Sequence, residues 1–187
     1  MESWPRREHY RYYTDILKVN YSMTARLDVT RLRAECDRLG VHFYAAFIWC
    51  VSNVVNRLEF MKMMTDAAGH PGVWDVVHPN YTIFHKDDHT FSDCWSEYNP
   101  EFAAFYDNIE KDMDAAKKVR GVKAKAGQPA NFYCISCVPW MDYTGYATSS
   151  ASDRIVLFPI IAFGKYTEHD GRLTLPLTLS IAHAAMD

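Results

Sequence analysis

The feature that most constrains the fold is a run of alternating residues near the end of the sequence. Leucine or isoleucine occupies every second position from Leu173 to Ile181, and most of the residues between them are small or carry a hydroxyl group. A repeat of two places successive side chains on opposite faces of a β-strand. We therefore expect a strand over 172–183 with one apolar face, and counting by twos puts His183 on that face.

The remaining sequence divides into helical segments first and strands later. The patterns predict a helix from Ser3 through Tyr13, a strand over 21–27, a helix capped by Thr30 that ends before Gly40, a helix over 43–58, two or three strands between 73 and 95, an amphipathic helix over 100–120, and strands over 131–138 and 155–166. A loop over 121–128 and a turn at 168–171 complete the chain. Because no regular βαβ alternation is present, this order predicts an α+β fold.

Composition excludes several classes of protein. With 187 residues, 49% of them apolar, residues 1–187 are expected to form a single domain. A net charge of −3 without a basic stripe argues against binding to nucleic acid. The longest apolar run, Tyr44 to Val51, is too short to span a membrane, and no secretion signal is visible at the start. Five cysteines without a framework spacing suit a reducing compartment, so we expect a cytoplasmic protein without a membrane partner.

Two motifs that suggest metal or redox chemistry are better explained as ordinary structure. Cys134 and Cys137 form a C-x-x-C motif, but residues three apart on a strand point to opposite faces. His85 and His89 bracket a polar run that reads as a connection between two strands. We therefore expect no metal site.

His183 can be interpreted in two ways from its local sequence. A histidine that closes an apolar row is often a core side chain whose ring bonds to a backbone carbonyl. Asp187 follows four residues later and completes the sequence His-x-x-x-Asp, in which the carboxylate can reach a nearby cation. The residues alone leave both interpretations open.

Six segments in order carry a resemblance to a known family. They are Trp4–Tyr10, Trp74–Pro79, Phe132–Trp140, Gly164–Tyr166, Leu175–Pro176 and His183–Asp187. Together they resemble chloramphenicol acetyltransferase of the trimeric type over nearly the whole chain. The same ending also occurs in the catalytic domain of dihydrolipoamide acyltransferases, so the motif alone indicates a fold and a reaction before a substrate.

The resemblance implies a fold, a reaction and an assembly. The expected fold is a two-layer sandwich, a large mixed β-sheet covered by helices, as in other CoA-dependent acyltransferases. His183 would act as general base on a hydroxyl of chloramphenicol or a similar molecule, which attacks acetyl-CoA, and Ser136 would stabilise the oxyanion. Asp187 would pair with Arg6 as structural support. Acetyl-CoA would be a co-substrate rather than a permanently bound cofactor. The expected assembly is a homotrimer with sites between subunits, and antibiotic resistance is the implied role.

The resemblance also assigns binding residues. Lys165, Tyr166 and Trp140 match positions near the coenzyme, where a cation can meet a phosphate and rings can cover the pantetheine or adenine. Tyr13, Phe91 and Cys134 match positions around the acceptor pocket. For each aromatic residue taken singly, core packing is an equally good explanation.

The sequence departs from the family pattern at several positions. Ala162 stands where the family usually carries a threonine that helps to hold the tetrahedral intermediate, and His42 where a coenzyme-contacting lysine can occur. The stretch Gly145–Ser149 differs from the family beside the acceptor pocket, so chloramphenicol itself is less firmly implied than acetyl transfer. The family continues past the aspartate with a C-terminal helix that this chain lacks, so we expect apolar sheet surface to be exposed.

Two alternatives to a chloramphenicol acetyltransferase follow from these observations. The first is another acyltransferase of the same fold, including one that uses dihydrolipoamide. The second is a truncated, inactive subunit that binds ligands without turnover, which Ala162 and the early end both suggest.

Overall fold

The computed structural model describes residues 4–66, 68–148 and 155–187. In chain order the elements are α1 (Arg7–Arg11), the π-helical turn η1 (Tyr12–Ile16), β1 (Asn20–Asp28), α2 (Thr30–Leu39), α3 (Phe43–Arg57), the 3-10 turn η2 (Glu59–Lys62), β2 (Met63–Thr65), β3 (Pro71–Val73), β4 (His78–His85), β5 (Thr90–Trp95), α4 (Phe102–Ala116), β6 (Phe132–Val138), β7 (Ile160–Gly164), β8 (Thr167–His169) and β9 (Arg172–Ala182). The sequence therefore folds with its helices mostly early and its strands mostly late, as predicted.

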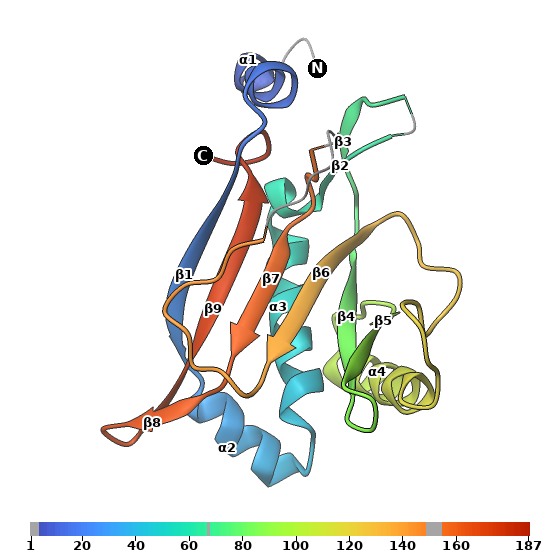
Figure 1. Ribbon diagram of the computed structural model, residues 1–187, viewed down its shortest axis with the longest axis vertical. Helices are drawn as coiled ribbons and strands as arrows, with labels where there is room; N and C mark the ends of the chain where they lie inside the picture. The colour runs from blue at the N-terminus through green and yellow to red at the C-terminus, as the bar shows by residue number, and fades with distance from the viewer. Residues whose placement is uncertain (1–3, 67, 149–154) are drawn as a thin grey trace.

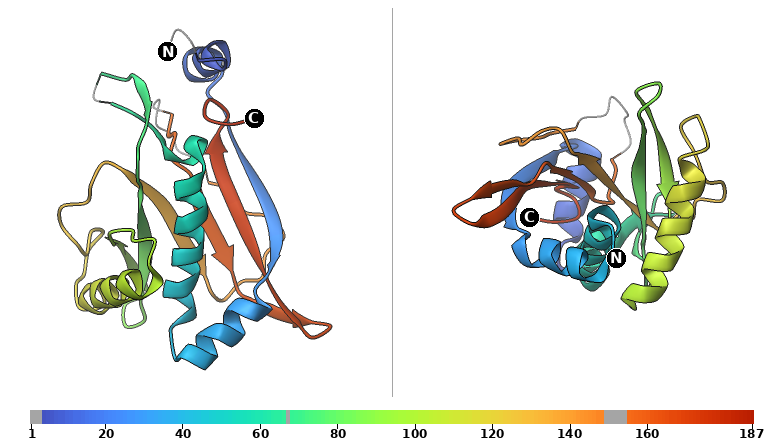
Figure 2. Two further views of the ribbon diagram at one scale, coloured as in Figure 1. Left: turned by 180° about the vertical axis from the view of Figure 1, so that it is seen from behind. Right: turned by 90° about the horizontal axis from the view of Figure 1, so that it is seen from below.

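A seven-stranded mixed sheet forms one layer of the molecule. Its order is β1-β9-β7-β6-β4-β5, with β8 paired to β9, while β2 and β3 form a separate two-stranded sheet. The strand β6 runs parallel to both β4 and β7, and the other pairs are antiparallel. Helices α3 and α4 lie behind the sheet as it is seen in Figure 1, and Figure 2 shows the two layers from behind and from below. The predicted two-layer α+β fold with a large mixed sheet is confirmed.

The alternating run forms β9, which pairs with β1 along its length. Leu175 is fully buried in the core between sheet and helices, and its alternate neighbours pack against the same core. On the opposite face the hydroxyls of Thr178 and Thr24 lie 2.7 Å apart, and those of Ser180 and Ser22 lie 2.6 Å apart. One face of β9 is therefore stabilised by packing in the core, and the other by hydrogen bonds between its hydroxyl groups and those of β1.

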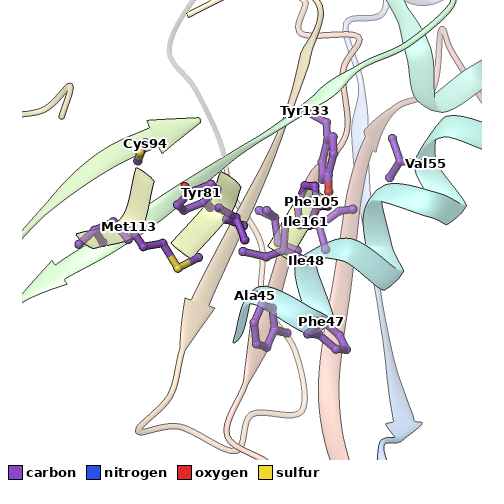
Figure 3. Close-up of a cluster of buried hydrophobic side chains, with 14 of the residues drawn as sticks. Ala45, Phe47, Ile48, Val55, Tyr81, Cys94, Phe105, Met113, Tyr133 and Ile161 are labelled. Carbon is purple, nitrogen blue, oxygen red and sulfur yellow. The ribbon is translucent and has the colours of Figure 1, made fainter. Parts of the chain in front are cut away.

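The main core lies between the sheet and helices α3 and α4. Figure 3 shows Ile48 of α3, Phe105 of α4, and Tyr81 and Ile161 of the sheet gathered in it. The buried hydroxyl of Tyr133 lies 2.7 Å from that of Ser52, so it keeps a hydrogen bond inside the core. Odd-numbered residues of β4, β6 and β7 enter this core, which leaves their even-numbered neighbours on the opposite face of the sheet.

Three predicted elements have different limits in the structure. The strand predicted over 155–166 is only β7, Ile160–Gly164, because Pro159 has no N–H to donate to a ladder. The helix predicted over 100–120 is α4, Phe102–Ala116. The strand predicted to reach His183 ends at Ala182, so His183 belongs to the turn that follows. Ser3, the predicted start of the first helix, lies outside the described residues.

The predicted cap at Thr30 is also wrong. Thr30 is the first residue of α2, and the Asp28 carboxylate accepts its backbone N–H at 3.0 Å. The Thr30 hydroxyl instead accepts the N–H of Leu173 at 2.8 Å. The carboxylate of Asp28 therefore accepts a backbone N–H at the start of α2. The hydroxyl of Thr30 is then available to connect α2 to β9.

The polar run at 85–89 contains the connection between β4 and β5. His85 itself is the buried last residue of β4, with its Nε2 2.8 Å from the hydroxyl of Ser92. His89 lies in the turn, where its ring stacks on Phe84 at 6.2 Å. Within the described residues no three His, Cys, Asp or Glu side chains gather closely enough to hold a metal ion.

An apolar surface remains open between α3 and the edge of the sheet. Met23 on β1 is 65% exposed. A groove of about 250 Å³ next to it is lined by Leu27, Phe47, Cys50, Val51, Val54, Val55, Met61, Ile161, Leu177 and Leu179. None of the helices in the described part of the chain has the length and apolar character needed to cross a membrane.

Candidate active site

His183 is the first residue after β9 and is held by contacts on several sides. Its backbone N–H donates to the carbonyl of Val19 at 3.0 Å, which continues the pairing of β9 with β1 by one residue. Its ring stacks on Tyr13, with centroids 3.9 Å apart, and meets Tyr21 edge-on at 5.6 Å. The side chain is 28% exposed. His183 is therefore an oriented imidazole that reaches solvent, which argues against the sealed core histidine that its sequence also allowed.

The hydrogen bonding of His183 determines which ring nitrogen carries the proton. Nδ1 lies 3.1 Å from the carbonyl oxygen of Met186. A carbonyl only accepts hydrogen bonds, so Nδ1 is the protonated nitrogen of the neutral ring. Nε2 then carries the lone pair, and among the described residues it has no hydrogen-bond partner. This is the arrangement that a general base requires.

Arg6 secures the loop that contains His183. Its guanidinium pairs with the carboxylate of Asp187 and donates a second hydrogen bond to the carbonyl of His183 at 3.0 Å. The hydrogen bond from Arg6 holds the pKa of Asp187 below its usual range, so the carboxylate remains charged at neutral pH. The predicted pair of Arg6 and Asp187 is thus present. Because Arg6 also bonds to the backbone carbonyl of His183, it orients the loop that contains His183.

Ser136 lies far from His183 within one chain. Ser136 on β6 is opposite Ala162 on β7, which is opposite Thr178 on β9. His183 is five residues beyond Thr178, or about 17 Å along the strand direction. Figure 1 shows the end of β9 beside α1 at one end of the molecule, while β6 runs toward the other end. A single chain therefore cannot bring the predicted base and the predicted oxyanion donor to one substrate.

The predicted acceptor-pocket residues divide into the same two groups. Tyr13 stacks on His183, whereas Phe91 and Cys134 lie near Ser136 on the sheet face that points away from α3 and α4. Phe91 is 59% exposed and pairs across the strands with Phe84. Burial raises the pKa of the Cys134 thiol to about 11, so it contributes a neutral wall rather than a charge. The aromatic residue Phe84 extends this surface, and sequence reasoning did not single it out.

A cavity of about 390 Å³ contains two of the predicted coenzyme residues. It is lined by Phe43, Tyr44, Cys137, Pro139, Phe163, Gly164, Lys165 and Tyr166. The walls are mostly apolar and suit a pantetheine arm, and Lys165 is exposed at the rim, where an ammonium can meet a phosphate. His42 precedes Phe43 at the start of α3, and its Nδ1 lies 2.6 Å from a carboxylate oxygen of Glu110.

Trp140 is not part of this cavity. Its ring is 61% exposed and lies 5.6 Å from that of Phe84, on the surface that carries Phe91. It does follow Pro139 directly, and Pro139 lines the cavity. The structure therefore brings Lys165 and Tyr166 together and leaves Trp140 beside them, on a neighbouring surface.

A second cavity of about 400 Å³ lies behind the loop that contains His183. Its lining includes Trp4, Arg6, Met63 and Ala185, but not His183. The Nε of Arg6 is buried and has no hydrogen-bond partner among the described residues. This cavity therefore lies beside Arg6, which supports the loop, and not beside the His183 ring.

Gly164 has a packing role that the sequence did not reveal. A Cβ atom at this position would lie 2.8 Å from Cγ of Pro176 and 3.0 Å from Cε1 of Tyr143, and it would collide with the carbonyl oxygen of Met141. That carbonyl accepts the N–H of Lys165 at 2.7 Å. The chain segment after β6 can cross β7 this closely only because residue 164 has no side chain.

We predict that Gly164→Ala destabilises the protein by about 1–3 kcal/mol, the usual cost of overpacking. The added methyl group must displace backbone atoms, so relief by rotation of a side chain is not available. Chemical denaturation followed by circular dichroism measures the change. Gly72→Ala is the matched control, because nothing lies within 4 Å of a Cβ there and its stability should be unaffected. Equal stability of the two variants would contradict the close approach.

Tyr143 brings a hydroxyl to the row of residues that contains Ser136. Its OH donates to the carbonyl of Ala162 at 2.8 Å and lies 3.4 Å from the hydroxyl of Thr178, which donates to it. Ala162, between Ser136 and Thr178 in the sheet, has only a methyl group. The hydroxyls closest to it therefore belong to Tyr143, in the loop after β6, and to Thr178 on β9. No sequence spacing predicts this contact, because Tyr143 follows β6 and reaches over β7 from outside the sheet.

The chain is similar to known proteins over its full length. The family model described as chloramphenicol acetyltransferase matches residues 1–187. The chain is 35% identical over 187 residues to chloramphenicol acetyltransferases of Clostridium perfringens and of Streptomyces acrimycini, covering 100% of this chain and 85% of each relative.

Solved structures show the same fold at lower identity. A chloramphenicol acetyltransferase structure superposes with a TM-score of 0.86 at 19% identity and covers 100% of this chain and 89% of its own. A dihydrolipoamide acetyltransferase of Azotobacter vinelandii superposes with a TM-score of 0.67 at 16% identity and covers 97% of this chain and 79% of its own. The architecture of the sheet and helices is thus shared with acyltransferases.

Proposed function

Since the chain belongs to the chloramphenicol acetyltransferase family, an acetyltransferase family, we propose that it moves an acetyl group from acetyl-CoA to a hydroxyl of chloramphenicol or a similar small molecule. The observation that carries the proposal is the state of His183: its Nδ1 is engaged by a carbonyl, and no side chain or backbone group in the described part of the chain bonds to its Nε2. Acetylation of the hydroxyl would alter the antibiotic, which links the activity to resistance.

The proposed reaction is a direct transfer with His183 as general base. Nε2 takes the proton of the acceptor hydroxyl while its oxygen attacks the thioester carbonyl carbon, which gives a tetrahedral oxyanion and an imidazolium. Collapse breaks the carbon–sulfur bond, and the leaving thiolate takes the proton back from the imidazolium. The products are the acetyl ester and free CoA, and the histidine returns to its starting state.

We propose that the oxyanion is stabilised by Ser136 of a neighbouring copy in a homotrimer. Support comes from the separation of Ser136 and His183 within one chain. It also comes from the sheet face that carries Ser136, Cys134 and the exposed Phe91, which none of the helices in the described part of the chain covers. A site at the boundary between two chains would combine the base of one with the oxyanion donor and the apolar acceptor wall of the other.

The proposed coenzyme site is the cavity beside Lys165 and Tyr166. Its apolar walls suit the pantetheine arm, and Lys165 supplies a cation for a phosphate. A cytoplasmic location is part of the proposal. It is supported by five free cysteines, which suit a reducing compartment.

The second candidate function is transfer to dihydrolipoamide, which the shared fold with a dihydrolipoamide acetyltransferase favours. The experiment measures the CoA formed from acetyl-CoA by chromatography, in parallel reactions with chloramphenicol, other primary alcohols and dihydrolipoamide, because transfer to a dithiol leaves the total number of thiols unchanged. We expect CoA release that depends on chloramphenicol or an alcohol. Release only with dihydrolipoamide would select the second function. CoA binding without release in any reaction would indicate an inactive subunit.

A further inference from the structure

One hydrogen-bonded group holds both walls of the proposed coenzyme cavity. Arg26 on β1 donates to the two carboxylate oxygens of Asp142 at 2.8 and 3.1 Å and to the hydroxyl of Thr167 at 3.1 Å. The Thr167 hydroxyl donates in turn to Asp142 at 3.2 Å. We refer to Arg26, Asp142 and Thr167 as the Arg26 clamp.

The clamp is attached to the cavity at two points of the chain. On one wall, Asp142 lies three residues after the lining residue Pro139. It directly follows Met141, whose carbonyl accepts the N–H of Lys165 at 2.7 Å. On the other wall, Thr167 directly follows Tyr166, a lining residue. Arg26 does not line the cavity itself, so any effect on a ligand there must pass through these two segments.

The geometry of the clamp indicates that it orients the segments that contain Asp142 and Thr167 and contributes little to the stability of the fold. Both charged side chains are partly exposed, and an exposed ion pair contributes little to the free energy of folding. The guanidinium nevertheless contacts three oxygens of these two segments, and its Nε donates to the hydroxyl of Thr174 on β9 at 3.4 Å. Because the fork is planar and fixed, it restricts how the segments can move apart. The Arg26 hydrogen bond also holds the pKa of Asp142 below its usual range, so the pair stays charged at assay pH.

We propose that Arg26 is a positioning residue for coenzyme binding, acting through Asp142 and Thr167 on the two walls that Pro139, Lys165 and Tyr166 line. The proposal rests on the proposed function, which assigns this cavity to CoA. Because the hydrogen bonds of the clamp involve neither His183 nor Ser136, the clamp governs binding of the coenzyme and not the chemical step.

The test compares Arg26→Gln, Asp142→Asn and the double variant. We expect each single change to raise the KM for acetyl-CoA, and the Kd for CoA measured by calorimetry, about tenfold while kcat stays within about twofold. The double variant should be no worse than the weaker-binding single variant, because the two residues act as one unit. Arg172→Gln is the matched control: it removes the same charge near the same end of the sheet, where Arg172 faces Asp28 at 3.9 Å, and its KM should not change.

Hydrogen exchange separates failure of this proposal from failure of the proposed function. Without any ligand, Arg26→Gln should speed exchange of the Lys165 amide, which is bonded to Met141. If the wild-type protein binds CoA and Arg26→Gln binds it equally well, the positioning role is wrong and the proposed function stands. If exchange speeds up but the wild-type protein does not bind CoA, the coenzyme assignment is wrong and the positioning role falls with it. An equal rise in KM for Arg172→Gln would also overturn the proposal.

Discussion

Replacing His183 with asparagine is expected to reduce turnover by about 10²–10⁴-fold, the usual contribution of a general base. The asparagine amide can still donate to the Met186 carbonyl, as Nδ1 does, so the loop should keep its conformation. The variant loses the lone pair of Nε2, together with the ring contacts to Tyr13 and Tyr21. Steady-state acetyl transfer and the melting temperature, measured on the same preparation, separate the loss of the base from unfolding.

His9→Asn is the matched control for this experiment. His9 is exposed on α1 and lies close enough to Asp187 to influence its charge, yet it has no role in the proposed reaction. Its turnover should match that of the unmodified protein. If His183→Asn were folded and retained near-full turnover, the assignment of the base would be wrong.

The second large effect is expected for Ser136→Ala, which should lower kcat by about 10²–10³-fold, as removal of an oxyanion donor does in other enzymes. The KM for the acceptor should change much less, because a hydroxyl that bonds the oxyanion acts mainly in the transition state. Ser22→Ala, which removes a hydroxyl from the same face of the sheet, is the control and should keep full kcat. A rise in KM without a fall in kcat would remove Ser136 from this role.

Mixing the two inactive variants tests whether the site combines two chains. In a trimer that contains both His183→Asn and Ser136→Ala subunits, one boundary pairs an intact His183 with an intact Ser136. Random reassembly from equal amounts should therefore restore about one quarter of the original activity. If both residues served the same site from one chain, the mixture would stay inactive.

The predictions from sequence succeeded where the signal was local. The alternation from Leu173 to Ile181 predicted β9 and its buried face because side-chain direction in a strand depends only on position. It missed the strand end by one residue, since the chain turns at His183, which the alternation of residues does not show. The predicted strand over 155–166 was too long because the prediction followed its apolar residues. It did not take into account that Pro159 has no N–H to donate to a neighbouring strand. The pairing of Arg6 with Asp187 came from the resemblance, because nothing in the local sequence relates residues so far apart.

The positions of the site residues in space were decided by the tertiary structure alone. Strand order places β9 between β1 and β7, and the register of β6, β7 and β9 separates Ser136 from His183, although each was recognised in the sequence. The same order places Arg26 beside Asp142 and makes Gly164 necessary beneath Met141. Local sequence determines which face a side chain occupies and which chemistry it offers. The strand order, which results from the packing of the whole chain, determines which of those side chains meet, because the pairing partners lie far apart in the sequence.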